Sequence, residues 1–180
     1  MTKTQEESDK RIQRLVGELI FWCGRVEFQL RRVLAHALFS KESIYRNFEL
    51  VNDEFKNIEI NKICNIIIML KNIHNIKMED DCVDKIKFYI SKQNRQSGSP
   101  EGTTSVRNSI VHSFFYINDD FCVCKNIDNA NDGEKHSYWP SGRKAQKYRI
   151  SDIEEHIFKT QALYDALEVV AIKTWKIPEG

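Results

Sequence analysis

Apolar residues recur every three or four positions along the first part of the chain, as they do on one face of an α-helix. Over residues 9–39 this spacing predicts one helix of about 31 residues, roughly 46 Å long at 1.5 Å per residue. Ser8 and Asp9 stand where a cap of this helix would be expected. A short segment over residues 44–51 follows. The helical spacing then returns and predicts further helices over residues 57–73 and 80–93.

The next helix follows a polar loop and begins near two threonines. Thr103 or Thr104 can cap it, because a side-chain hydroxyl can accept a hydrogen bond from the first backbone N–H groups. The apolar positions of this helix run from Val106 to Phe115. A turn at residues 118–120 ends it.

The pattern becomes strand-like before the last helix. Residues 121–127 alternate as in a strand, and residues 147–150 look like further strand. Ser151 and Glu154 have the spacing of a capping box, which predicts that the last helix begins here. A small β-hairpin or loop insertion over residues 118–150 therefore separates the last two helices.

These elements predict an all-α fold, a four- to five-helix up-and-down bundle with a small β-hairpin insertion before the last helix. A length of 180 residues suits one domain, which we place over residues 1–180. The charges nearly cancel, with 27 Lys and Arg against 26 Asp and Glu, so the net charge argues for no class of partner. The longest apolar run is Ile66 to Leu70, far short of the ~20 residues of a membrane span, and we expect no membrane partner.

Five cysteines are present, and their pattern favours neither a disulfide framework nor a metal site. Cys23, Cys64 and Cys82 lie in apolar helical contexts and are interpreted as small core residues. Cys122 and Cys124 would share one face of a strand, but a zinc site would need a second pair of ligands. We therefore expect no metal and no other cofactor, and a cytoplasmic, reducing compartment.

The stretch Ser105 to Tyr116, SVRNSIVHSFFY, contains Arg107, Asn108 and His112 in the order Arg-Asn-x-x-x-His. Bare Arg–His spacing is not specific, because Arg31 and His36 are separated by the same gap. Asn directly after Arg, with His at this distance, is expected only about 0.02 times by chance in a chain of this composition. The motif resembles the signature of HEPN-domain ribonucleases, and the order of the predicted helices is similar to theirs.

The resemblance implies a metal-independent endoribonuclease. The 2′-hydroxyl of RNA would attack the phosphate and leave a cyclic phosphate. Histidine titrates near neutrality and suits proton transfer, and arginine stays charged and can grip two phosphate oxygens. In one continuous helix Asn108 would share a face with His112, whereas Arg107 would lie about 140° away. HEPN ribonucleases complete this site by dimerising, so the resemblance implies a homodimer with one composite cleft.

The resemblance also implies a toxin or an antiviral defence effector, with RNA as its target and an antitoxin or another regulatory protein as a further partner. One position departs from a known subgroup. HEPN toxins paired with a minimal nucleotidyltransferase antitoxin carry a tyrosine two residues after the histidine, as the acceptor of adenylylation. This chain has Phe114 there, which has no hydroxyl group.

A basic segment lies inside the predicted β insertion. Residues 134–150 carry a charge of about +4 and three interleaved aromatic residues, and cations beside stacking surfaces are typical of proteins that bind single-stranded RNA. The candidate RNA-binding residues are Lys135, Arg143, Lys144, Lys147 and Arg149, with Tyr138, Trp139 and Tyr148 between them. The alternative is an ordinary solvated hairpin whose aromatic residues cover the bundle.

A second hypothesis for the whole chain is a non-catalytic, HEPN-like dimeric module that binds RNA or a protein. In that case Asn108 and His112 would form hydrogen bonds between helices, and Arg107 would pair with an acidic neighbour. A shared, solvent-open cleft around the motif would favour the enzyme, and a buried, fully paired motif would favour the module.

Overall fold

The computed structural model describes residues 3–38, 58–74, 76, 78–91, 102–111, 113–118, 121–126 and 146–175. This part of the chain contains five helices and three short strands. The helices are α1 (Lys3–Leu38), α3 (Ile60–His74), α4 (Asp80–Ile90), α5 (Thr103–Val111) and α6 (Ile150–Trp175). The strands are β1 (Ser113–Asn118), β2 (Phe121–Asn126) and β3 (Gln146–Arg149). The predicted segment over residues 44–51 and the aromatic pair Tyr138 and Trp139 lie outside the described residues.

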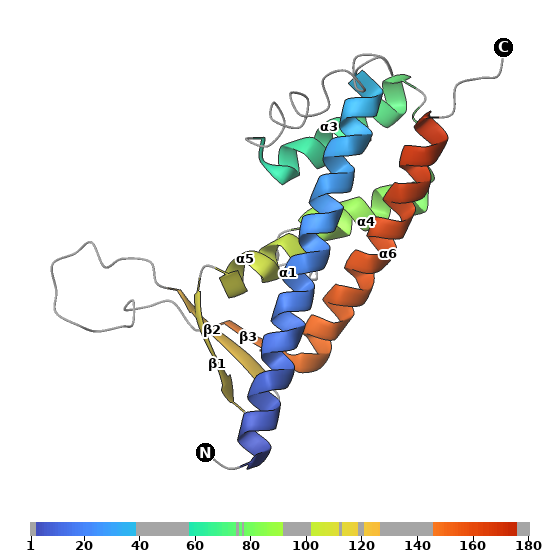
Figure 1. The fold of residues 1–180 in the computed structure, drawn as a ribbon. Coiled ribbons are helices and arrows are strands. Elements are labelled where there is room, and N and C mark those ends of the chain that lie inside the picture. Colours follow the sequence, from blue (N-terminus) through green and yellow to red (C-terminus); the bar gives the residue numbers. More distant parts are fainter. Residues whose placement is uncertain are drawn as a thin grey trace, which may run out of the picture.

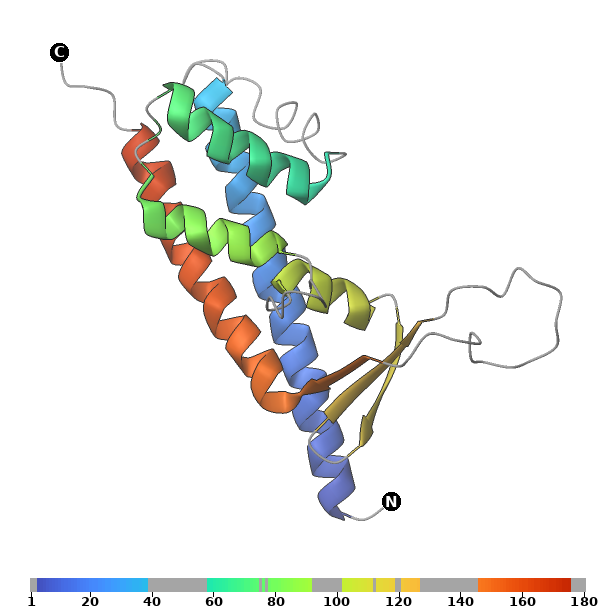
Figure 2. The ribbon, with the colours of Figure 1, turned by 180° about the vertical axis from the view of Figure 1, so that it is seen from behind.

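The two long helices, α1 and α6, lie side by side along the length of the molecule (Figure 1). Helices α3, α4 and α5 follow one another across α1, behind it in Figure 1 and in front of it in the reverse view of Figure 2. The small sheet lies near the N-terminal end of α1 (Figure 1). The predicted helical bundle with a small β insertion before the last helix is thus confirmed.

The core is formed by the apolar faces that predicted these helices. Leu19 and Leu30 of α1, Ile67 of α3, Ile86 of α4 and Leu167 of α6 are completely buried. The cysteines interpreted as core residues, Cys23, Cys64 and Cys82, are free thiols and are buried as expected. Burial is the largest influence on these thiols and raises the pKa of Cys64 to about 12, so the group is protonated at neutral pH.

The strands form an antiparallel sheet in the order β1-β2-β3, with Phe115 opposite Cys124 and Cys122 opposite Tyr148. Cys122 and Tyr148 are buried. The prediction that the motif helix continues to Phe115 is wrong, because α5 ends at Val111 and residues 113–118 form β1. A short run of aromatic and β-branched residues fits either helix or strand, and here pairing with β2 decides the outcome.

Two helix starts differ from the predicted ones. Helix α1 begins at Lys3, so Ser8 and Asp9 lie inside the helix rather than at its N-terminus. Helix α6 begins at Ile150, and the backbone N–H of Arg149 donates to Oδ2 of Asp152 at 3.1 Å. Asp152 therefore satisfies the cap position, which is the role predicted for Glu154.

The junction between α4 and α5 fixes the direction of the motif helix. The N–H of Gly102 donates to the carbonyl oxygen of Ser91 at 3.1 Å, and the carbonyl of Gly102 accepts the first hydrogen bonds of α5. Neither threonine serves as the predicted cap. Thr104 donates its hydroxyl proton to the carbonyl of Tyr89 at 3.1 Å. The hydroxyl of Thr103 lies 3.1 Å from Nδ1 of His156, which ties α5 to α6.

This junction generates a first prediction. A Cβ at position 102 would lie 2.6 Å from the carbonyl oxygen of Ser91 and even closer to that of Phe88, both backbone atoms. We expect Gly102→Ala to lower the free energy of unfolding by about 1–3 kcal/mol, because neither neighbour can rotate away. Chemical denaturation measures the change. Lys87→Ala, a surface change near the end of α4, is the control and should stay within about 0.5 kcal/mol of wild type.

Candidate functional site

Arg107 forms a salt bridge between α5 and α1. Its Nη2 donates to Oε1 of Glu27 in a short contact, and the two side chains are only 24% and 19% exposed. Nε of Arg107 is buried, and no described residue accepts a hydrogen bond from it. A second arginine, Arg31 of α1, has its Nη2 at 3.9 Å from the other carboxylate oxygen of Glu27. Two cations thus flank one half-buried carboxylate.

Beside this pair lie two neutral polar residues, Tyr89 and Cys23. The phenol of Tyr89 on α4 donates to the backbone carbonyl of Cys23 at 3.4 Å. Burial, with a smaller contribution from Glu27, raises the pKa of Tyr89 well above its usual value and that of Cys23 to about 11. These groups stay protonated at neutral pH. Protonated groups cannot act as nucleophiles or bases, so Tyr89 and Cys23 have no such role at this site.

The other two motif residues, Asn108 and His112, are not part of this salt bridge. Asn108 is exposed beside the half-buried Arg107. His112 lies outside the described residues, between the end of α5 and the start of β1. Helix α5 ends at Val111, so the predicted shared face of Asn108 and His112 lies partly outside the described residues.

The basic segment is described only at its end. Lys135, Arg143 and Lys144 lie outside the described residues. Lys147 and Arg149 belong to β3, where alternate residues share a face, and Arg149 is exposed. Tyr148 between them is 7% exposed. Its ring therefore belongs to the covering of the bundle, as the solvated-hairpin alternative holds, and is not available for stacking on a base.

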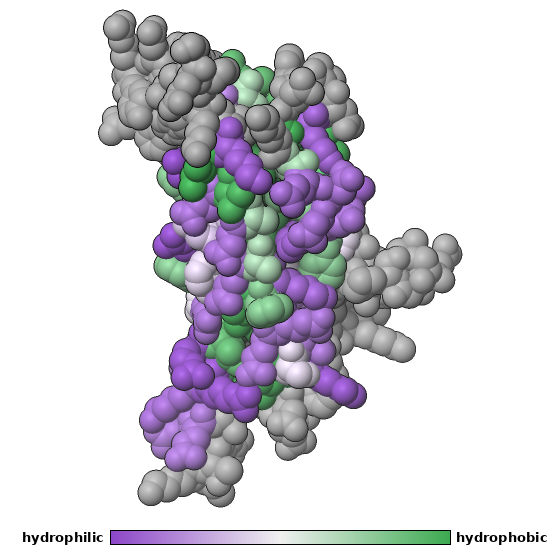
Figure 3. All heavy atoms as spheres, turned by 90° about the vertical axis from the view of Figure 1, so that its right-hand side faces the viewer, coloured by the Kyte–Doolittle hydropathy of each residue, from purple (hydrophilic) through white to green (hydrophobic). Residues whose placement is uncertain are grey.

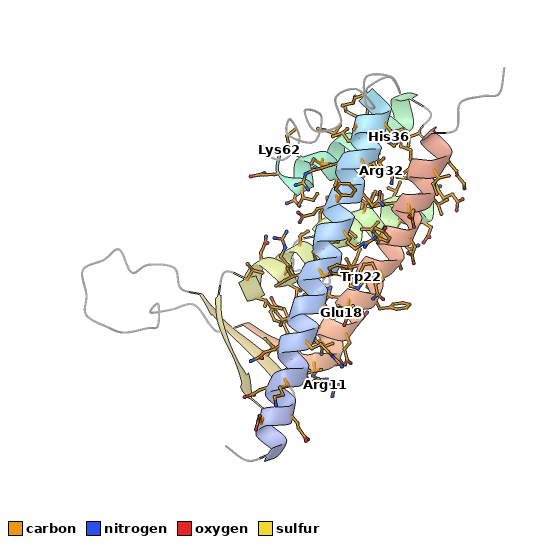
Figure 4. The ribbon with its side chains drawn as sticks, in the orientation of Figure 1. Arg11, Glu18, Trp22, Arg32, His36 and Lys62 are labelled. Atoms are coloured by element: carbon orange, nitrogen blue, oxygen red, sulfur yellow. The ribbon has the colours of Figure 1, made fainter. Side chains whose placement is uncertain are left out.

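Two further histidines, His156 of α6 and His36 of α1, pack against other parts of the bundle. His156 is next to the hydroxyl of Thr103 and stacks on Phe88 with ring centroids 5.8 Å apart. His36 is half-buried on α1, along the same helix as Arg32 (Figure 4). Burial and, to a lesser degree, Arg32 lower the pKa of His36 to about 4. His36 is therefore neutral at physiological pH and is a packed residue.

Among the described residues, no three His, Cys, Asp or Glu side chains gather in a way that could hold a metal ion. None of the described helices is both long and apolar enough to cross a membrane. In comparison with known proteins, the chain matches no family model, no curated protein and no solved structure. The likeness to HEPN domains thus depends on Arg107, Asn108 and His112 and on the order of the helices.

Glu27 is the site residue that sequence reasoning missed. It is separated from Arg107 by 80 positions, and no local pattern joins them. The signal was its place on the helix. Glu27 follows the buried Cys23 by one turn and so lies at the margin of the core face, where a carboxylate needs a partner.

The salt bridge generates a second prediction, tested by a double-mutant cycle. Glu27→Gln and Arg107→Gln should each lower the free energy of unfolding by about 1–3 kcal/mol, because each leaves a half-buried charge without its partner. The double variant should recover part of this loss, so that the coupling energy exceeds about 0.5 kcal/mol. Arg31→Gln is the matched control, because Arg31 approaches Glu27 only to 3.9 Å. A coupling no larger than that of Glu27 with Arg31 would contradict the assignment.

Proposed function

We propose that this chain is a metal-independent endoribonuclease of the HEPN type that acts as a homodimer. The observation that carries the proposal is the arrangement of Arg107 and Asn108 on α5. Arg107 is held in a fixed direction by Glu27, at the boundary between core and solvent, and Asn108 is exposed directly beside it. A positioned cation next to an open polar side chain is what recognition of a phosphate requires.

The salt bridge supports the function rather than blocking it. A guanidinium group has five N–H donors, and Glu27 accepts from only one of its edges. Nε is buried, so the donors left for two oxygens of one phosphate would be those of Nη1 and the second N–H of Nη2. Glu27 is thus a positioning residue, which acts on the reaction through the orientation of Arg107.

The chemistry follows from the residues of the motif. His112 would accept the proton of the RNA 2′-hydroxyl as its oxygen attacks phosphorus. The bond from phosphorus to the 5′-oxygen breaks, and the leaving oxygen takes a proton from His112 of the partner subunit. Arg107 would stabilise the negative charge that grows on the phosphate oxygens. The products are a 2′,3′-cyclic phosphate and a free 5′-hydroxyl.

Two copies are needed because one copy supplies one histidine, whereas this reaction uses a base and an acid at once. Such an enzyme would act on RNA in the cytoplasm as a toxin or an antiviral defence effector. An antitoxin or another regulatory protein would then control it, since unrestrained cleavage of RNA harms the cell.

One observation favours a second candidate function, the non-catalytic dimeric module. Arg107 does pair with an acidic neighbour, as that hypothesis expects, and its side chain is mostly buried. In such a module the pair would only fix α5 against α1. Asn108 is exposed, which both the enzyme and the module allow. A measurement of RNA cleavage distinguishes the two functions.

The third prediction concerns cleavage. Arg107→Ala and His112→Ala should each reduce cleavage of RNA at least a hundredfold, because proton transfer and charge stabilisation each contribute roughly this much. Activity should persist in excess chelator, and the products should carry cyclic phosphates, detected by mass spectrometry. His74→Ala is a matched control because His74, at the end of α3, lies outside both the motif and residues 134–150. Wild-type activity in either motif variant, or cleavage that stops in chelator, would contradict this mechanism.

The fourth prediction concerns the basic segment. Reversing the charges of Arg143, Lys144 and Lys147 to Glu should weaken RNA binding and flatten its dependence on salt, because fewer counterions are released. Fluorescence anisotropy at several salt concentrations measures both effects.

The control reverses three exposed lysines elsewhere, Lys10, Lys62 and Lys87, and so changes the net charge equally. An equal loss in both variants would reveal a general charge effect. Unchanged affinity in the segment variant would assign residues 134–150 to an ordinary solvated hairpin.

A further inference from the structure

Helix α1 is apolar on two opposite sides. One side forms the core, through residues such as Leu19 and Val26. On the opposite side Phe21 and Phe28 are 55% and 44% exposed, and Ile20 beside them is 43% exposed. An outward helix face is normally polar, so a face with exposed aromatic rings indicates an interaction surface.

Two glycines alternate with these phenylalanines. Gly17, Phe21, Gly24 and Phe28 fall within about 60° of one another around the helix, at 100° per residue. A Cβ added at Gly17 or Gly24 would meet nothing within 4 Å. All four positions are exposed, so the described helices and strands leave this face of α1 largely uncovered.

The order of the four residues is complementary to itself. If a second α1 packs antiparallel on this face, with a two-fold axis between positions 22 and 23, Phe21 meets Gly24 of the partner subunit. The same register places Phe28 on Gly17 of the partner subunit. Every ring would then lie on a glycine, where the backbones can approach closely.

The charges at one margin of the face agree with this register. Glu18 and Arg25 lie on the same side of α1, seven positions apart, at the margin that α6 borders, where Arg25 also donates to the hydroxyl of Tyr164. In the antiparallel arrangement Glu18 comes within about 3 Å, along the helix axis, of Arg25 of the partner subunit. The two-fold axis makes this pairing twice. A second copy of the chain therefore fits both the shape and the charge of the face.

The opposite margin connects this face with the candidate site. Glu27, which holds Arg107 of α5, lies about 80° from Gly17 around α1, on the side away from Glu18. A two-fold axis perpendicular to the plane of the two α1 helices keeps this margin on one side for both copies. Both α5 helices would then border the same groove.

We propose that a second copy of this chain binds antiparallel along the outer face of α1 defined by Gly17, Phe21, Gly24 and Phe28. This inference rests on the proposed function in one respect, since it supplies the interface of the homodimer which that function needs. The other long helix offers the competing surface. Phe158, Val169 and Ile172 of α6 are also exposed, and the face in Figure 3 shows a hydrophobic band along the long axis between hydrophilic flanks.

The double variant Gly17→Ala with Gly24→Ala tests the interface without destabilising the single subunit. The added methyl groups meet nothing within the subunit, and alanine favours a helix, so the melting temperature should stay equal or rise. Sedimentation velocity at micromolar concentration should show the wild type at twice 21.2 kDa. The variant should dissociate at least tenfold more readily. Phe158→Ala is the matched control and should remain dimeric.

Disulfide cross-linking tests the register. In a Cys124→Ser background, Phe21→Cys combined with Gly24→Cys should give an oxidised dimer, because the proposed register places position 21 opposite position 24 of the partner subunit. Cys23, Cys64, Cys82 and Cys122 are buried and should not compete. Combining Glu7→Cys with Phe158→Cys should give much less. A wild-type monomer, a dimer that survives the glycine substitutions, or a dimer that depends on Phe158 would overturn the inference.

Cleavage assays keep this inference separate from the proposed function. An oxidised, folded dimer that cleaves no RNA would leave the α1 interface in place and refute the ribonuclease. Full cleavage by a protein whose dimer is unaffected by the glycine substitutions would refute the interface and leave the ribonuclease in place.

Discussion

The buried side of α1 is the surface on which α3, α5, α6 and β1 all pack. This helix has 36 residues and is about 54 Å long at 1.5 Å per residue, so each partner takes its own stretch of it. Short helices such as α5, with nine residues, would be marginal alone and gain their stability from this packing. The position of the motif is therefore set by α1, with Gly102 and two threonine hydroxyls fixing the direction of α5.

The salt bridge between Glu27 and Arg107 contributes more to position than to stability. Removing two charges from water costs about as much as their attraction returns, and a well-packed apolar pair could stabilise the bundle equally. An apolar pair would tolerate sliding and rotation of α5, whereas a guanidinium and a carboxylate require one geometry. The neutral Tyr89 and Cys23 beside the pair add no competing charge.

Helical periodicity predicted α1, α3, α4 and α6, because their apolar faces are long and each faces the core. The segment Ser113–Asn118 was misread as helix because Phe114 and Phe115 follow Ile110 and Val111 by four positions. Only pairing with residues 121–126 distinguishes the two states, and such pairing is not local. Arg107 and Asn108 could be selected from the sequence by their order. The partner of Arg107 could not, because 80 positions separate it from Glu27 and several other carboxylates offer the same charge.

The margins of α1 join the two proposals physically. Three surfaces follow one another around the circumference of this helix: the core face, the margin with Glu27, and the outer face with Phe21 and Phe28. Any change in the direction of α1 relative to a second copy would move both copies of α5, since each is tied to its own α1 through Arg107. In the proposed dimer, a rigid helix with a subunit contact on one side and an anchored arginine at its margin would transmit the geometry of the dimer to Arg107. The precision of the proposed composite site would thus come from α1, which fixes the direction of Arg107 on α5.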